Sequence, residues 1–164
     1  MAEALGGQYL TFALADETYG IEVEKIREIL EMQPITSVPR TAEYLLGVMN
    51  VRGRVVPVVD LRLKFGLEKI ASTVHTAIMV LEVEDSGEKS QIGLLVDSVD
   101  QVYTLNDEDV EAAPTVGTSV NTRLLKGMGK FQDQFILLLD TDVIFTREDW
   151  GVDLYADEET AEKE

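Results

Sequence analysis

Cysteine is absent from this sequence of 164 residues. Its absence excludes disulfides, thiol nucleophiles and cysteine metal sites, and it fits a reducing compartment. Positive charge is also scarce, because 14 basic residues stand against 31 acidic ones and give a formal net charge of −17. A field of this sign repels phosphates and anionic lipid headgroups, so nucleic acids and membrane surfaces make poor partners. Basic protein surfaces remain open as partners.

Long apolar runs are lacking as well. The longest, such as Phe135–Leu139, fall far short of the roughly 20 residues that a membrane-spanning helix needs. The N-terminal stretch MAEALGG contains neither the basic region nor the apolar region of a signal peptide. A hydrophobic fraction of 45% nevertheless supplies a real core. These features predict a cytoplasmic chain of one compact domain or two very small ones.

Catalytic motifs are missing too, since no GxGxxG, P-loop, GxSxG or HExxH pattern occurs. The single histidine, His75, is interpreted as a surface or strand-end residue of a predicted strand over Thr73–Glu84, with a phosphorylated histidine as the alternative. Asp140–Asp142 and Asn106–Asp109 supply oxygen ligands, but neither has the spacing of an EF-hand loop. We therefore expect no catalysis, metal or cofactor. A carboxylate-based hydrolase or metal-dependent phosphatase is the competing class, supported only by the density of acidic residues.

The segment Leu45–Leu67, LLGVMNVRGRVVPVVDLRLKFGL, has the pattern of a β-hairpin. Four valines favour an extended backbone in its second strand, and Asn50–Gly53 supplies the turn. Pro57 lacks an N–H and is therefore predicted on an edge strand or at a bulge. Arg52 at the turn can fork onto a carboxylate or backbone carbonyls of a partner helix, with a solvated turn residue as the alternative.

Alternating apolar and polar residues predict further strands over Gln8–Ala15, Tyr19–Val23, Thr73–Glu84, Ser90–Val96, Val99–Leu105, Arg123–Phe131 and Phe135–Asp140. Apolar residues at 23, 26, 29 and 30 recur at spacings of three and four, which predicts a short amphipathic helix or a strand-to-helix switch. Short helical segments are expected over Thr41–Leu46, Asn106–Ala113 and Thr141–Phe145, and before a predicted helix C-cap at Gly66. The acidic stretch Ala156–Glu164 is expected to fray.

A weak internal repeat relates the two halves of the chain. A shift of 80 residues superposes Gly47, Asp60 and Phe65 on Gly127, Asp140 and Phe145, and a shift of 73 superposes Gly20, Val23, Ile26 and Ile29 on Gly93, Val96, Val99 and Val102. Duplicated units of this kind predict two small β-barrels packed side by side, with a chance match between β-rich halves as the alternative. A groove between the barrels would take a helix or peptide, with Ile26, Ile29, Val99 and Val102 on its walls and burial in the core as the alternative for each of them.

Four segments resemble the CheW family of bacterial chemotaxis coupling proteins. They are YGIEVEKIREIL at 19–30, GVMNVRGRVVPVVDLRLKFGL at 47–67, IGLLVDSVDQVYTL at 92–105 and LLKGMGKFQDQFILLLDTDVIF at 124–145. The resemblance implies a mainly β fold of two SH3-like five-stranded barrels packed side by side, with a few short helices. Residues 8–150 would form a single CheW-like domain of two intertwined barrel subdomains, and residues 1–7 and 156–164 would be disordered tails.

The same resemblance implies a non-catalytic adaptor that couples chemoreceptors to the histidine kinase CheA. The receptor's helical-hairpin tip would bind in the groove and the kinase's regulatory domain at the barrel ends, in the cytoplasm beneath membrane-associated arrays. Matching the motifs position by position assigns receptor binding to Ile26, Glu28, Arg52, Val99 and Val102, and it assigns no kinase-contact residue. A paralogue serving surface motility or another kinase array, and an oligomer that pairs through the Pro57 strand, are the alternatives.

Overall fold

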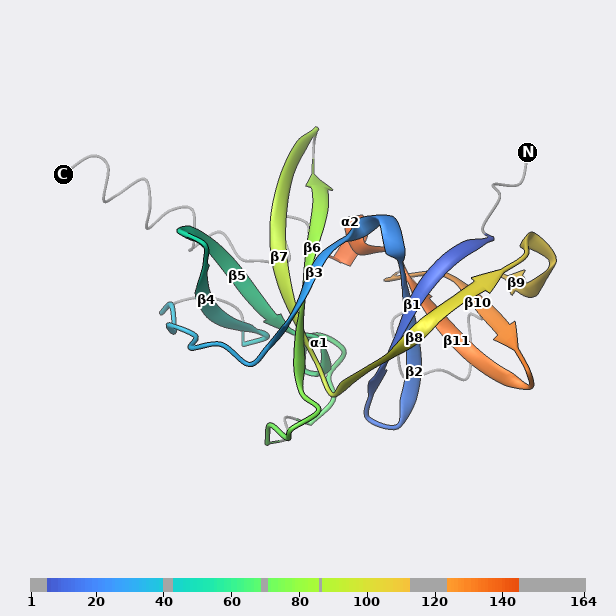
Figure 1. Cartoon of the computed structure of the whole chain (residues 1–164), viewed down its shortest axis with the longest axis horizontal. Coiled ribbons are helices and arrows are strands. Elements are labelled where there is room, and N and C mark those ends of the chain that lie inside the picture. The colour runs from blue at the N-terminus through green and yellow to red at the C-terminus, as the bar shows by residue number, and fades with distance from the viewer. Residues whose placement is uncertain (1–5, 40–42, 69–70, 86, 113–123, 145–164) are drawn as a thin grey trace.

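The computed structural model describes residues 6–39, 43–68, 71–85, 87–112 and 124–144, which form two β-sheets side by side (Figure 1). The five-stranded sheet, here called the first lobe, has the order β3-β6-β7-β5-β4 and consists of β3 (Ile26–Glu31), β4 (Leu45–Val51), β5 (Arg54–Asp60), β6 (Ala77–Asp85) and β7 (Glu88–Val96). The six-stranded sheet, the second lobe, has the order β8-β1-β2-β11-β10-β9 and consists of β1 (Gly7–Leu14), β2 (Glu17–Glu22), β8 (Ser98–Leu105), β9 (Val110–Glu111), β10 (Leu125–Phe131) and β11 (Gln134–Leu139).

Four short helical segments join the strands. The α-helices α1 (Leu61–Lys64) and α2 (Thr141–Ile144) follow β5 and β11, and the 3-10 turns η1 (Val23–Lys25) and η2 (Asp107–Asp109) follow β2 and β8. Asp60 caps α1, because its Oδ1 accepts a hydrogen bond from the backbone N–H of Arg62 at 3.0 Å. Gly66 lies just beyond α1 with φ of +78°, as the predicted C-cap requires.

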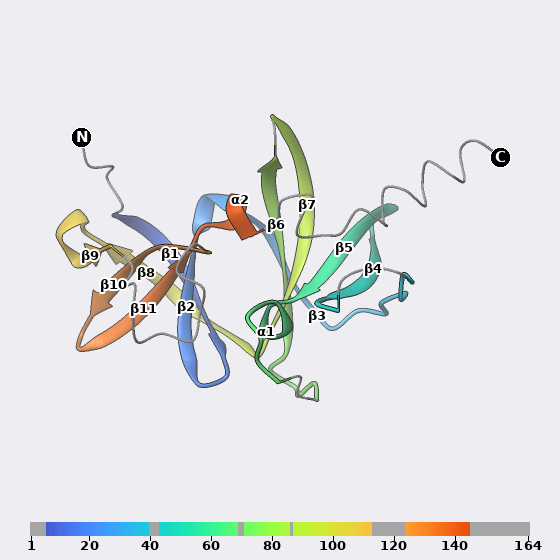
Figure 2. The same ribbon diagram turned by 180° about the vertical axis from the view of Figure 1, so that it is seen from behind.

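The two lobes exchange strands at two crossings. β2 of the second lobe runs through η1 into β3 of the first lobe, and β7 of the first lobe runs through Asp97 into β8 of the second. Figure 2 shows the two lobes from behind, with the chain passing between them at both places. Each lobe is therefore completed by chain that comes from the other.

The internal repeat of the sequence corresponds to an equivalent pairing of strands in the two lobes. β5 pairs with β7 in parallel with Val58 opposite Gly93, and β11 pairs with β2 in parallel with Leu138 opposite Gly20. These are the same two positions under the shifts of 80 and 73 residues. The chance-match alternative is therefore wrong.

The two edges of each sheet are linked by one further segment. The chain after β3 bridges β4, where Thr36 and Val48 exchange two backbone hydrogen bonds of 2.8 Å. In the second lobe β9, which follows β8 and η2, pairs with β10 at Met128 and Glu111. In each lobe the linking segment thus connects one edge strand of the sheet to the opposite edge, so few backbone groups at those two edges are left unpaired.

Buried apolar side chains form three clusters. One fills the first lobe around Val58 and Ile78, and a smaller one fills the second lobe around Tyr9 and Leu138. The largest lies between the lobes and draws residues from both. Fully burying each large apolar side chain contributes about 1.5–3 kcal/mol, so this central cluster makes the stability of one lobe depend on the other.

Three predicted elements differ from the structure. The helix expected around Val23–Leu30 is wrong beyond the η1 turn, because β3 pairs with β6 and alternates between half-buried and exposed residues. The strand expected from Thr73 begins only at Ala77, since the side chains and backbone of Thr73 and Thr76 hydrogen-bond to each other in a turn. The segment after Asn106 forms the η2 turn with a capping box and then β9 rather than a longer helix.

Pro57 and the residues before β4 are also placed by the strand pairing. β5 has neighbours on both sides, so it is not an edge strand of the sheet, and Pro57 lies at the point where β5 leaves β7. Within the predicted helical segment Thr41–Leu46, residues 43–44 form a turn and Leu45 begins β4, and positions 41–42 lie outside the described residues. The predicted Ala156–Glu164 tail also lies outside them.

Candidate functional site

Arg52 occupies the tip of the β4–β5 hairpin. It adopts φ of +50° and the following Gly53 φ of +84°, so both central residues of the two-residue turn are left-handed, as the type I′ turn requires. The side chain of Asn50 accepts a hydrogen bond from the Gly53 N–H at 2.9 Å and fixes the turn. Most non-glycine residues avoid this backbone conformation, so Arg52 is held there by its neighbours.

Arg52 forms a two-point ion pair with Glu28. Its Nη1 and Nη2 donate to Glu28 Oε2 and Oε1 at 2.6 and 3.0 Å. The Arg52 side chain is 74% exposed, whereas that of Glu28 is 19% exposed. The hydrogen bonds and charge of Glu28 raise the pKa of Arg52 above its usual value. The hairpin tip is therefore tied to β3, and it presents a guanidinium to solvent in a defined orientation.

The apolar candidates occupy matching places in the two lobes. Ile26 lies opposite Leu81 on β6, and Val99 lies opposite Phe12 on β1, and both pack against the central cluster. The 73-residue partners Ile29 and Val102 are 45% and 49% exposed. Of the four apolar candidates, each of the two crossing strands thus carries one that packs against the central cluster and one that is exposed.

The structure brings the five predicted residues together only in part. Glu28 and Arg52 touch, and Ile26 and Val99 share the central cluster. Val102 lies farther along β8, opposite Leu10 on β1. Figure 1 draws β3 and β8 in front of their neighbouring strands, and Figure 2 draws both behind them, so the strands that carry Ile26, Glu28, Val99 and Val102 lie on one side of the molecule.

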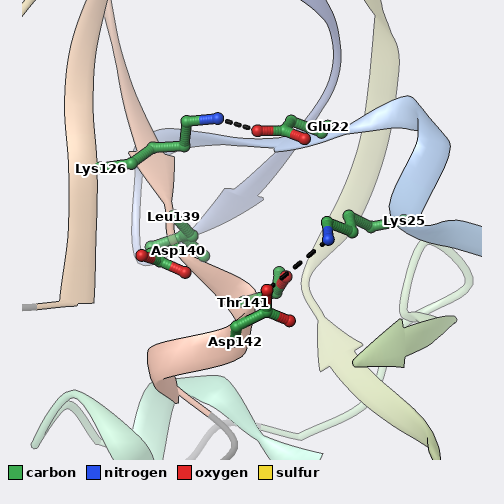
Figure 3. Close-up of a pocket in the computed structure, with 7 residues that line it drawn as sticks. All are labelled: Glu22, Lys25, Lys126, Leu139, Asp140, Thr141 and Asp142. Carbon is green, nitrogen blue, oxygen red and sulfur yellow. Dashed lines mark ion pairs between the residues drawn. The ribbon is translucent and has the colours of Figure 1, made fainter. Parts of the chain in front are cut away.

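A polar pocket of about 380 Å³ lies at the first crossing (Figure 3). Lys126 of β10 pairs with Glu22 of β2, and Lys25 of η1 pairs with Asp142 of α2 at 3.6 Å. Asp142 also accepts a hydrogen bond from the Glu84 N–H of β6 at 3.1 Å. These lysines neutralise carboxylates of neighbouring elements, and the Asp142–Glu84 contact joins α2, which follows the second lobe, to β6 of the first.

Sequence reasoning missed the second crossing, where Asp97 connects three segments. Asp97 Oδ1 lies 3.3 Å from Arg62 Nε, its Oδ2 accepts from the Ala15 N–H at 2.9 Å, and its own N–H donates to the Ala13 carbonyl at 3.1 Å. Arg62 is only 3% exposed and also lies 3.6 Å from the buried Asp60. The available signal was the repeat, which places Glu24 at the first crossing opposite Asp97 at the second.

The remaining candidates for chemistry do not converge. His75 is exposed in the turn before β6, where its backbone N–H donates to Thr73 Oγ1. Within the described ranges, no three His, Cys, Asp or Glu residues gather in a group that could hold a metal ion. No helix among the described residues is long and apolar enough to cross a bilayer.

Two lobes that share a core and present charged and apolar side chains on crossing strands define a scaffold that binds other proteins. Comparison with known proteins agrees with this class. The family model "CheW-like domain" matches residues 8–149. The chemotaxis protein CheW of Klebsiella aerogenes is 31% identical over 150 residues, which cover 92% of this chain and 88% of that protein. The chemotaxis protein CheW of Helicobacter pylori is 33% identical, with 86% and 82% covered.

A solved structure supports the same assignment. The scaffolding protein TtCheW from Thermoanaerobacter tengcongensis matches with a TM-score of 0.77 and 30% identity, over 86% of this chain and 93% of that one. The chain belongs to the CheW family. It is a chemotaxis scaffold protein of the mainly β fold predicted from the sequence, in a family of non-catalytic adaptors that couple receptors to the kinase CheA.

Proposed function

We propose that this protein binds the cytoplasmic helical-hairpin tip of chemoreceptors with one face and the regulatory domain of CheA with another, in the cytoplasm at membrane-associated receptor arrays. The observation that carries the proposal is the Arg52–Glu28 pair. It holds an exposed guanidinium at a fixed place beside β3, on the side of the molecule where β3 and β8 display apolar residues. A helical hairpin offers both carboxylates and an apolar stripe, which such a face complements.

The proposed receptor-binding residues act in two ways. Arg52 and Glu28 supply a charged recognition point at the first lobe, where the ion pair limits the directions in which the guanidinium can point. Ile26, Val99 and Val102 supply apolar contact from both lobes. A partner that binds through both lobes would be sensitive to the relative placement of the lobes, which the two crossings determine.

Calorimetric titration with a receptor tip fragment and, separately, with the CheA regulatory domain tests the proposal. We expect both to bind at micromolar concentrations. Arg52→Ala should weaken binding of the receptor tip and leave binding of the kinase domain unchanged. Gln132→Ala is the matched control, because Gln132 occupies the equivalent hairpin tip of the second lobe and is also left-handed, with φ of +49°. Absence of binding to both partners would contradict the proposal.

A further inference from the structure

β5 and β7 of the first lobe diverge. They pair only where Val58–Asp60 lies opposite Gly93–Leu95, and residues 54–57 and 88–92 then separate (Figure 1). On the separating sides β5 keeps its pairing to β4, and β7 keeps its pairing to β6. Within the described ranges, no third strand pairs with residues 54–57 or 89–92 along the edges that face each other across this opening.

The open edge of β5 has usable backbone groups. The N–H and C=O of Val48 are both hydrogen-bonded to Thr36. Val48 and Pro57 therefore form a non-hydrogen-bonded pair, and the backbone of Pro57 faces away from β4. The same side of the strand two residues earlier belongs to Val55, which has a free N–H as well as a carbonyl. Pro57 blocks continuous pairing, while Val55 permits local pairing with an added strand.

A pocket of about 320 Å³ lies between these edges and combines positive charge with apolar surface. Val55 is 69% exposed there. Arg54 and Lys89 also line it, and neither forms an ion pair with a described carboxylate. The pocket's carboxylate, Glu82, is held by Arg27 at 2.5 Å, and Arg27 lowers the pKa of Glu82.

A further residue that lines the pocket has a side-chain acceptor without a hydrogen-bond donor in the described part of the chain. The side-chain oxygen of Gln91 is buried and accepts no hydrogen bond from the described residues. A buried acceptor of this kind is costly unless a donor reaches it. The opening therefore suits an extended, acidic segment that offers backbone N–H groups and apolar side chains.

We propose that the occupant is residues 148–155 of this same chain, EDWGVDLY. Its three carboxylates stand without a basic residue, and Trp150, Val152 and Leu154 alternate as on one face of a strand. The carboxylates complement Arg54 and Lys89, and the apolar face covers Val55. In a chain of net charge −17, two cations outside any ion pair with a described carboxylate are a scarce site for such a segment.

The path to the pocket is short. α2 ends at Ile144, and Asp142 within it accepts a hydrogen bond from Glu84 N–H on β6. Glu84 lies opposite Lys89 on β7, and Lys89 lines the pocket. The chain after α2 has only the width of the β6–β7 hairpin to cross, and three extended residues span roughly 10 Å.

Trp150 is the only tryptophan of the protein, so its fluorescence tests the proposal in the full chain. We expect blue-shifted emission and several-fold weaker acrylamide quenching than in a free peptide of residues 145–164. Arg54→Glu combined with Lys89→Glu should restore peptide-like emission and quenching, and so should Val55→Asp. Phe135→Asp is the matched control, because Phe135 is the 80-residue counterpart of Val55 and is 57% exposed, and it should change nothing. Circular dichroism confirms that each variant is folded.

Three outcomes would overturn the proposal. Peptide-like emission in the unaltered protein would show that Trp150 is not covered. Shielding that survives the Arg54→Glu/Lys89→Glu exchange and Val55→Asp would place Trp150 elsewhere. Shielding that disappears on dilution would show that a second copy, and not the same chain, supplies the segment.

Discussion

At the scale of single residues, Arg52 gains its orientation from two unlike sources. The left-handed turn directs its side chain away from the hairpin, and Glu28 on β3 captures it at two points. The sequence motif singles out Arg52, and the resemblance adds Glu28, but no sequence rule pairs residues 24 positions apart across two strands that are not neighbours in the sheet. The ion pair turns two separate candidates into one recognition element.

Arg52→Ala should weaken receptor-tip binding about tenfold or more, because a guanidinium with two fixed hydrogen bonds acts as a binding anchor. The melting temperature should stay nearly unchanged, since an exposed ion pair contributes little to stability. Glu28→Ala should weaken binding in the same direction, and the double variant should be little worse than Arg52→Ala alone. Titration calorimetry and thermal melts measure both effects. Additive losses of binding would show that the two side chains act independently.

Tyr19 is a residue whose burial sets a pH limit on the fold. It stacks between Phe12 and Phe65 with ring centroids 5.9 and 5.6 Å away and is 1% exposed. Burial, with a smaller contribution from the charge of Glu17, raises the pKa of Tyr19 from 10 to about 12. A neutral phenol is thus favoured in the folded state, and the unfolded chain loses its proton first as the pH rises.

The stability that depends on neutral Tyr19 is fully present below pH 10 and is lost as the pH rises toward about 12. The loss is on the order of 2–3 kcal/mol. Tyr19→Phe should flatten this alkaline decline in urea unfolding measured at several pH values. Burial also raises the pKa of Tyr9, which accounts for a remaining slope. Tyr103→Phe should leave the decline intact, and an equal flattening there would assign it to general surface charge.

At the scale of elements, local sequence patterns predict those strands, turns and helix ends that depend on interactions between residues close in the sequence. Valine-rich β5, the two-residue turn at Arg52–Gly53 and the short helix after Asp60 follow from branching, glycine and capping, and the structure contains all three. β3 could not be predicted in this way. Its apolar spacing fits a helix, but pairing with β6, which is distant in the sequence, supplies more backbone hydrogen bonds and burial than one isolated helical turn can.

Gly47 is the element-scale residue on which the linking bridge of the first lobe depends. A Cβ at this position would lie 2.0 Å from the carbonyl oxygen of Thr36, and φ is +149°. Gly47→Ala should therefore destabilise the protein by about 3 kcal/mol, measured by urea unfolding. Gly66→Ala is the control. It has φ of +78° but no atom near the added methyl group, so only about 1 kcal/mol of backbone strain is expected. Equal losses would show that the bridge tolerates the methyl group.

At the scale of the whole molecule, the lobes are joined by a shared core and by charges at both crossings. The central cluster contains residues of both sheets, and Tyr19 of the second lobe stacks on Phe65 of the first. The repeat made the duplication predictable, because each half keeps the same pattern. The contacts between the halves were not predictable, because Arg62 and Asp97 belong to different motifs and meet through the parallel pairing of β5 with β7, where Asp60 lies opposite Leu95.

Arg62 is where loss of one side chain should affect both lobes. It is 3% exposed and counters Asp60, which is fully buried, and Asp97, which also fixes the β1–β2 turn through Ala15. Arg62→Met would leave these carboxylates without a cation, and breaking a buried ion pair in this way costs about 3–5 kcal/mol. Urea unfolding should show that loss in one transition, because the lobes share their core. Arg27→Met removes an arginine from an ion pair at the surface and should change stability little.

The double variant Arg62→Met/Asp97→Asn separates the contribution of the charge from that of packing. Removing the negative charge together with the positive one should recover part of the stability that Arg62→Met loses, with a coupling of about 1 kcal/mol or more. Asparagine also keeps an acceptor for the Ala15 N–H, so the β1–β2 turn retains its contact with the crossing. If the two losses simply add, the crossing is held by packing alone. If they compensate, the Arg62–Asp97 pair sets how β8 leaves the first lobe, and with it the position of Val99 and Val102 relative to β3.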